Sequence, residues 1–120
     1  MSDSSRRRRR PIRPGKLFER RNGIPTTPGE LFRIFKEERI LERTAAGEIS
    51  SRLVYDEHPS APKAEEPFCT KSQLLAYYTT AGQKIAEAHQ YLRTDGSIGA
   101  SGMPDPKEVV HSGSLYYLDG

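Results

Sequence analysis

The chain has 120 residues and a net charge of +3; 34% of its residues are apolar, and Leu, Ile, Val and Phe together number only 23. This length suits one small domain, and so few large apolar residues put the chain near the composition of disordered proteins. No apolar run exceeds the five residues from Leu74 to Tyr78, which excludes a transmembrane helix and a secretory signal peptide. The single cysteine, Cys69, excludes an internal disulfide framework and a zinc site with several cysteine ligands. We therefore expect a small soluble protein with an ordered part and long unstructured segments.

Positive charge is concentrated at the start of the chain. Residues 1–21 hold nine Lys and Arg against two acidic residues, a net charge of +7, whereas the other 99 residues carry −4. Five consecutive arginines, Arg6 to Arg10, repel one another and favour an extended segment. This pattern is that of a basic arm attached to a mildly acidic body.

Proline and glycine mark the predicted organisation of the chain. We predict a disordered basic arm over residues 1–25, which ends in a turn at Asn22-Gly23. Residues 26–120 are predicted to form a single small domain with a Pro-rich linker at about 56–69.

The first predicted element is a helix over about 28–46. Thr27 is a suitable N-cap, Pro28 suits the first helical position, and Glu30 completes a capping box. Apolar residues then recur along one side at helical spacing, and Gly47 is typical of a helix C-terminus.

A second helix is predicted over about 71–93. A capping-box pattern opens at Thr70, and Gly82 lowers the helix stability by roughly 1 kcal/mol relative to Ala. The apolar residues that follow step by four and three positions, as in less than three heptads of a coiled coil. They are Leu74, Tyr78, Ala81, Ile85, Ala88 and Leu92. This spacing favours packing against another helix.

The C-terminal part is predicted to be short elements and loops. Residues 96–102 form a Gly-rich loop, and a capping box at Asp105 starts a short helical turn through Val109 and Val110. Residues 115–118 form a C-terminal strand, for which residues 52–55 offer a partner strand. The predicted fold class is therefore mainly α, with a small α+β fold as the alternative.

The arginine run is the most informative feature for function. Guanidinium groups displace counterions from phosphate backbones and donate paired hydrogen bonds to phosphate oxygens. Because Phe18 is the only aromatic residue of the arm, we expect electrostatic, sequence-independent contacts without stacking on single-stranded bases. The residues predicted to contact nucleic-acid phosphates are Arg6, Arg7, Arg8, Arg9, Arg10, Arg13, Arg20 and Arg21.

Catalytic and cofactor sites are not predicted. His58, Cys69, His89 and His111 match no metal-ligand spacing, and no activated nucleophile is marked by its neighbours. The Gly-rich loop lacks the lysine that phosphate-binding loops need, and it is predicted to follow a helix instead of a strand. We expect a non-enzymatic protein without a cofactor or metal.

A protein partner is predicted because two helices bury too little apolar surface for strong stability. Leu74, Tyr78, Ile85 and Leu92 are predicted to contact another protein or a second copy of the chain. The expected function is that of a small accessory protein whose arm binds nucleic acid and whose helical body binds a protein. The alternative is a pure protein–protein adaptor, or an antitoxin-like module, whose arm docks on an acidic partner. No membrane partner is expected, and the expected location is the cytoplasm, or the nucleus or nucleoid.

Overall fold

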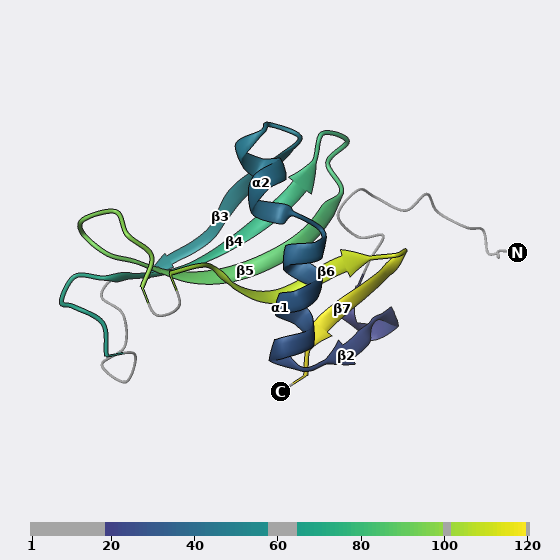
Figure 1. The fold of residues 1–120 in the computed structure, drawn as a ribbon, viewed down its shortest axis with the longest axis horizontal. Helices are drawn as coiled ribbons and strands as arrows, with labels where there is room; N and C mark the ends of the chain where they lie inside the picture. Colours follow the sequence, from purple (N-terminus) through teal and green to yellow (C-terminus); the bar gives the residue numbers. More distant parts are fainter. Residues whose placement is uncertain (1–18, 58–64, 100–101, 120) are drawn as a thin grey trace, which may run out of the picture.

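The computed structural model describes residues 19–57, 65–99 and 102–119. Its strands form one six-stranded sheet in the order β2-β7-β6-β5-β4-β3, in which β2 is parallel to β7 and every other neighbouring pair is antiparallel (Figure 1). In chain order, the elements are η1 (Arg20–Asn22), β2 (Ile24–Thr26), α1 (Pro28–Glu37), α2 (Ile40–Ala45), β3 (Ile49–Glu57), β4 (Lys71–Thr79), β5 (Lys84–Leu92), β6 (Asp105–His111) and β7 (Ser114–Leu118).

The mainly α fold predicted from the sequence is therefore wrong, since the structure is mainly β with only two α-helices among the described residues. The largest error concerns residues 71–93, which form β4 and β5 instead of one long helix. Gly82 lies in the turn between these strands with a φ of 87°, a left-handed conformation that no helix interior contains. The Gly82 amide donates to the Thr79 carbonyl at 2.9 Å, and the Thr79 amide donates to the Gln83 carbonyl at 2.9 Å. This short loop therefore closes a β-hairpin.

The helix predicted over 28–46 is two helices, α1 and α2. Its start is as predicted, because Pro28 opens α1 and the Thr27 hydroxyl accepts a hydrogen bond from the Glu30 amide at 3.2 Å. The helix breaks at Arg39, whose φ is 54°, and the change in direction buries Ile40. Chain direction thus changes where the apolar stripe of the sequence is interrupted by charged residues.

The C-terminal prediction is correct for its strand and for the described part of the loop: residues 96–99 and 102 lie between β5 and β6 outside the named strands, and residues 100–101 lie outside the described residues. The helical turn predicted through Val109 and Val110 is absent, because both residues belong to β6. The predicted strand over residues 115–118 lies within β7, but its neighbours are β6 and β2. Residues 52–55 belong to β3, at the opposite edge of the sheet.

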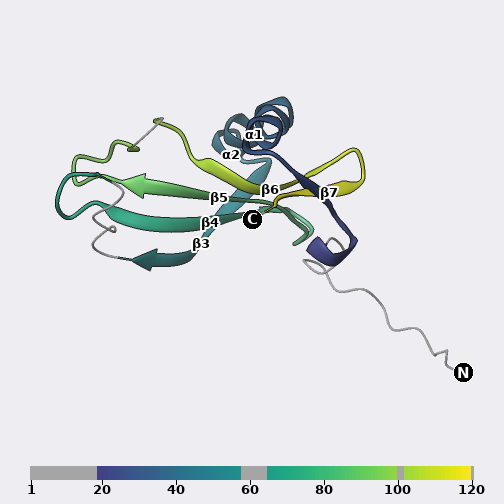
Figure 2. The ribbon, with the colours of Figure 1, turned by 90° about the horizontal axis from the view of Figure 1, so that it is seen from below.

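The hydrophobic core lies between the two helices and one face of the sheet, as Figure 2 shows. From α1, Leu31, Ile34 and Phe35 are almost fully buried. Phe35 packs its ring edge-on against Tyr77 of β4, with centroids 6.1 Å apart. Burial raises the pKa of the Tyr77 hydroxyl, because the charged form loses its hydration.

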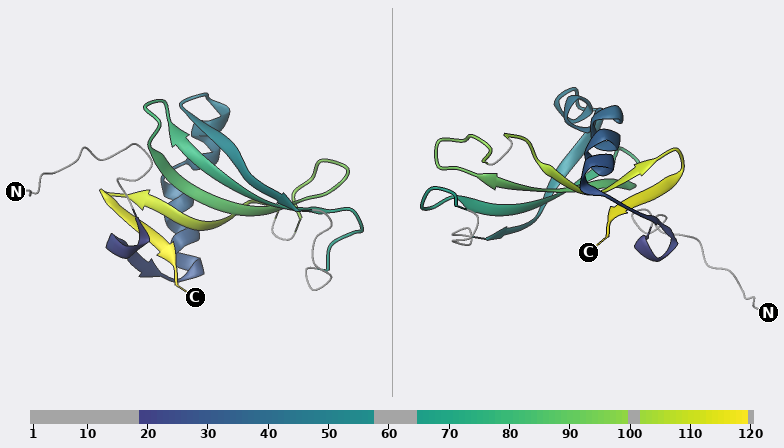
Figure 3. Two further views of the ribbon diagram at one scale, coloured as in Figure 1. Left: turned by 180° about the vertical axis from the view of Figure 1, so that it is seen from behind. Right: turned by 60° about the horizontal axis from the view of Figure 1, so that its bottom comes forward.

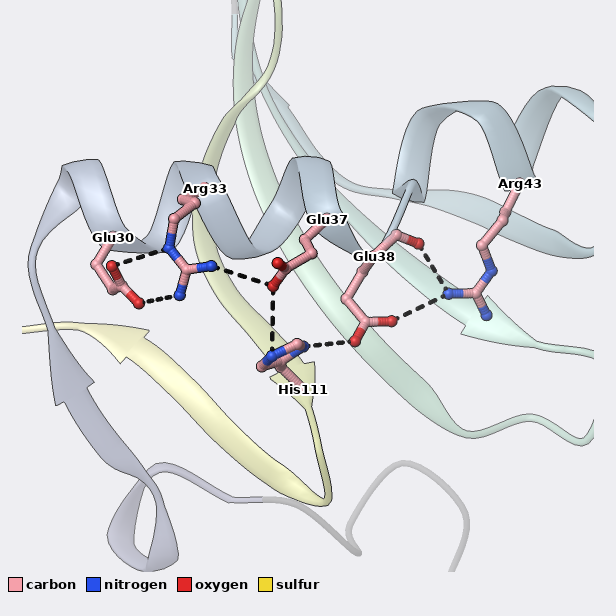
Figure 4. Close-up of polar contacts among 6 residues, drawn as sticks. All are labelled: Glu30, Arg33, Glu37, Glu38, Arg43 and His111. Carbon is pink, nitrogen blue, oxygen red and sulfur yellow. Dashed lines mark hydrogen bonds and ion pairs between the residues drawn. The ribbon is translucent and has the colours of Figure 1, made fainter.

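A chain of polar contacts ties the helices to the sheet (Figure 4). On β6, His111 contacts Glu38 through Nδ1 at 2.7 Å and Glu37 through Nε2 at 3.5 Å. Arg33 donates to Glu37 at 3.1 Å, and Arg43 of α2 donates to the Glu38 carbonyl at 3.1 Å. These contacts all lie on the helical side of the sheet.

No described helix covers the other face of the sheet, which we call the open face. Figure 3 shows it in the left view, where the strands lie in front of α1. None of the described helices is long and apolar enough to cross a membrane. The binding features below concern the open face.

Candidate binding groove on the open face of the sheet

Strand register determines which side chains lie on the open face. Tyr77 of β4 faces the core. Its partner on β5 is Ala86, whose partner on β6 is Val109, and both of these residues also face the core. Side chains of the intervening residues point to the open face, because successive residues of a strand alternate. Four of the six tyrosines lie on that face: Tyr55, Tyr78, Tyr91 and Tyr117.

The open face is hollowed by two adjoining cavities of about 540 and 470 Å³. Both are lined by Tyr55, His89 and Lys107, which come from β3, β5 and β6. The larger cavity extends to Tyr91, and the smaller one extends to Tyr117. We refer to the two cavities together as the groove, and each has the size typical of a small-ligand site.

Arg20 joins the N-terminal segment to one end of the groove. Its Nε donates to Oε1 of Glu108 at 2.8 Å, and its guanidinium carbon lies 5.5 Å from the centre of the Tyr117 ring. The guanidinium thereby combines an ion pair with a cation–π contact. Because Arg20 also lines the smaller cavity, the described part of the chain, which starts at Glu19, begins next to the groove.

The carboxylate of Glu108 lies at the centre of an ion-pair network. Its side chain is only 8% exposed, and its Oε2 lies 3.3 Å from Nζ of Lys84, which also contacts Glu87. Burial disfavours the charge on Lys84, but the hydrogen bond to Glu87 and the charge of Glu108 outweigh it, so the pKa of Lys84 is raised. The acidic residues near Arg20 are thus neutralised by cations of the protein.

His89 and Lys107, two other polar residues of the groove, also contact other side chains of the protein. Ser72 and Nε2 of His89 are 2.7 Å apart, and the His89 ring meets Tyr91 edge-on with centroids 4.7 Å apart. Lys107 pairs with Asp105 at 3.3 Å. The groove is consequently close to neutral and rich in aromatic rings.

The predicted phosphate-binding arginines fall in two groups. Arg20 and Arg21 lie in η1, where Arg20 reaches the groove and Arg21 pairs with Glu19 at 2.8 Å. The others lie outside the described residues: Arg6, Arg7, Arg8, Arg9, Arg10 and Arg13. The predicted arm, over residues 1–25, thus includes described residues from Glu19 onward, and Ile24 and Pro25 belong to β2.

The residues predicted to contact a protein do not share one surface. Leu74 and Tyr78 lie on the open face, and Leu74 lines the groove. Ile85 packs against the core, and Leu92 pairs with Lys71 at the end of β5. The helical seam that was expected to unite them is absent because these residues alternate between two faces of a sheet.

Sequence reasoning missed most groove residues, namely Tyr55, His89, Tyr91, Lys107 and Tyr117. A signal for Tyr117 is present, since alternation along the correctly predicted C-terminal strand separates it from Tyr116. The others become neighbours only through the register of four strands, which no local pattern specifies.

No group of three or more His, Cys, Asp or Glu within the described ranges is arranged to hold a metal ion. Comparisons with protein-family models, with curated proteins and with solved structures found no match to this chain.

Proposed function

We propose that this protein is a non-enzymatic nucleic-acid-binding protein whose N-terminal arginines contact the phosphate backbone. The observation that carries the proposal is the separation of charge along the chain. The described residues contain 11 Lys and Arg against 15 Asp and Glu, whereas residues 1–18 contain seven Lys and Arg against one Asp. A polyanion is therefore attracted by the arm and not by the acidic body.

Arg20 supports the same proposal because it connects this arm to the groove. The arm is thus joined to the body next to a surface that is neither strongly acidic nor covered by a described helix. Contacts of the arm with phosphates are sequence-independent, and they weaken as salt competes for the phosphates.

The test is fluorescence anisotropy with labelled duplex DNA, single-stranded DNA and single-stranded RNA at several salt concentrations. Two variants of the full chain each lose three positive charges. One replaces Arg7, Arg8 and Arg9 by Gln, and the matched control replaces Arg33, Lys36 and Arg39 by Gln on the helical side.

We expect the arm variant to bind at least about tenfold more weakly at low salt, with a salt slope shallower by about two to three. The control variant should bind like the unmodified chain. Equal losses in both variants, or no binding at low salt by the unmodified chain, would refute the proposal.

The second candidate function is an adaptor whose arm docks on an acidic protein. It is favoured by the same concentration of positive charge in one segment, because such a segment attracts any extended polyanion. If the unmodified chain binds no nucleic acid but binds polyglutamate through its arm, the result supports the adaptor function.

A further inference from the structure

We propose that the groove on the open face binds single-stranded nucleic acid, with bases stacked on its tyrosine rings. This inference rests on the proposed function and adds the strandedness of the ligand and the surface that holds its bases. The sequence alone favoured binding without stacking, because the arm itself has so little aromatic character. The fold changes this conclusion by gathering tyrosines from distant parts of the chain onto one face.

The groove is lined by tyrosine side chains. Tyr55 and Tyr117 line the smaller cavity, and Tyr55 and Tyr91 line the larger one. Tyr55 is 40% exposed although it lies in a strand. Exposed aromatic rings on an uncovered sheet are suited to unpaired bases, since every base has a π-face that stacks without regard to sequence.

Two arginines lie over tyrosine rings of the open face. The guanidinium of Arg52 lies over the ring of Tyr78, 4.7 Å from its centre, and Arg20 lies over Tyr117. Each arginine covers one face of its ring, and a planar guanidinium group can itself stack on a base. The nearby carboxylates of Glu87 and Glu108 already contact Lys84, which reduces their repulsion of a phosphate chain.

The arm is joined to the body beside the groove. Described residues begin at Glu19, directly before Arg20, and Arg20 and Tyr117 line the same cavity. One strand can therefore contact both the arm and the ring of Tyr117. A duplex offers no unpaired bases to these rings and gains only the phosphate contacts.

The experiment uses the full chain and fluorescein-labelled 12-nucleotide oligouridylate, oligothymidylate and a 12-base-pair duplex at 50 mM salt. One variant combines Tyr55→Leu with Tyr117→Leu, and a second combines Tyr55→Phe with Tyr117→Phe. Phe32→Leu is the matched control, because Phe32 is an aromatic residue of α1 on the helical side, with Lys36 lying over its ring. Far-UV circular dichroism verifies the sheet in each variant.

We expect both single strands to bind more tightly than the duplex. The leucine variant should lose about 25-fold or more of this affinity, at about fivefold or more per ring, while the phenylalanine variant and Phe32→Leu retain it. The chain has no tryptophan, so its intrinsic fluorescence comes from its six tyrosines, and the unlabelled oligonucleotides should quench part of it.

Two results would overturn the inference while leaving the proposed function intact. One is arm-dependent binding of duplex and single strands with equal affinity, and the other is full single-strand affinity in the leucine variant. If no nucleic acid binds to the unmodified chain at 50 mM salt, both the inference and the proposed function fail.

Discussion

Replacing Gly82 by Ala distinguishes the β-hairpin from the helix that the sequence pattern favours. In a helix over 71–93, the change would increase the free energy of unfolding by roughly 1 kcal/mol. In the structure, Gly82 has a φ of 87°, and a residue with a Cβ pays about 1–2 kcal/mol in that conformation. The substitution also restricts the unfolded chain, which returns about 0.4–1 kcal/mol. We therefore expect a net destabilisation of about 1 kcal/mol.

The assay is urea unfolding followed by far-UV circular dichroism, together with the thermal midpoint. A loss of 1 kcal/mol should lower the midpoint by about 4–8 °C in a domain of this size. Gly29→Ala is the matched control, because Gly29 lies within α1 and a Cβ there meets nothing within 4 Å. It should stabilise the protein by up to about 1 kcal/mol. An increase in stability for Gly82→Ala would refute the hairpin.

Three further predictions concern stability. Burial raises the pKa of Tyr77, and the ion pairs of Lys84 raise its pKa despite the opposing effect of burial. Both groups therefore keep their protons to higher pH in the folded state than in the unfolded chain. Stability should thus be full below about pH 10 and fall as the pH rises through the folded-state values, and urea unfolding from pH 8 to 11 should show a shallower fall in Tyr77→Phe. Gly99→Ala should lower stability by about 1–2 kcal/mol in urea unfolding, because the new Cβ would lie 2.4 Å from an oxygen of the Glu66 carboxylate, which is buried and held by Arg93 at 2.8 Å; no loss would contradict this packing. Leu31→Ala should cost about 2–5 kcal/mol, since Leu31 is fully buried, and calorimetry showing a loss below 1 kcal/mol would contradict its place in the core.

The start of α1 was predictable because its signals are local. Thr27, Pro28 and Glu30 act within a single helical turn, and their roles in the structure match the capping pattern. The end of α1 was less predictable, because Arg39 adopts a left-handed conformation that its residue type does not favour.

The hairpin of β4 and β5 was mistaken for a helix because both faces of these strands carry apolar or small residues. Leu74 and Tyr78 lie on the open face while Tyr77 lies in the core, so the alternation that marks a half-buried strand is lost. Ala86 and Ala88 add to the helical character of the sequence. In the structure they are buried in the core cluster that also contains residues of α1.

The candidate site was predictable only at its charged end. Arg20 belongs to the basic segment over residues 1–21, which the uneven distribution of charge marks, and it does line the groove. Tyr55 and Lys107 are separated by more than fifty residues and meet through strand register, which depends on the whole sheet.

The parallel pairing of β2 with β7 affects the order in which the protein is assembled. Ile24 pairs with Tyr116, and the Arg20–Glu108 contact spans 88 positions of the chain. Contacts between such distant residues require the closure of a large loop, which makes folding slow. Arg20 is synthesised long before β6 and β7, which provide Glu108 and Tyr117. Its ion pair with Glu108 and its contact with the Tyr117 ring therefore form only after these strands are present, and they belong to the late contacts of folding.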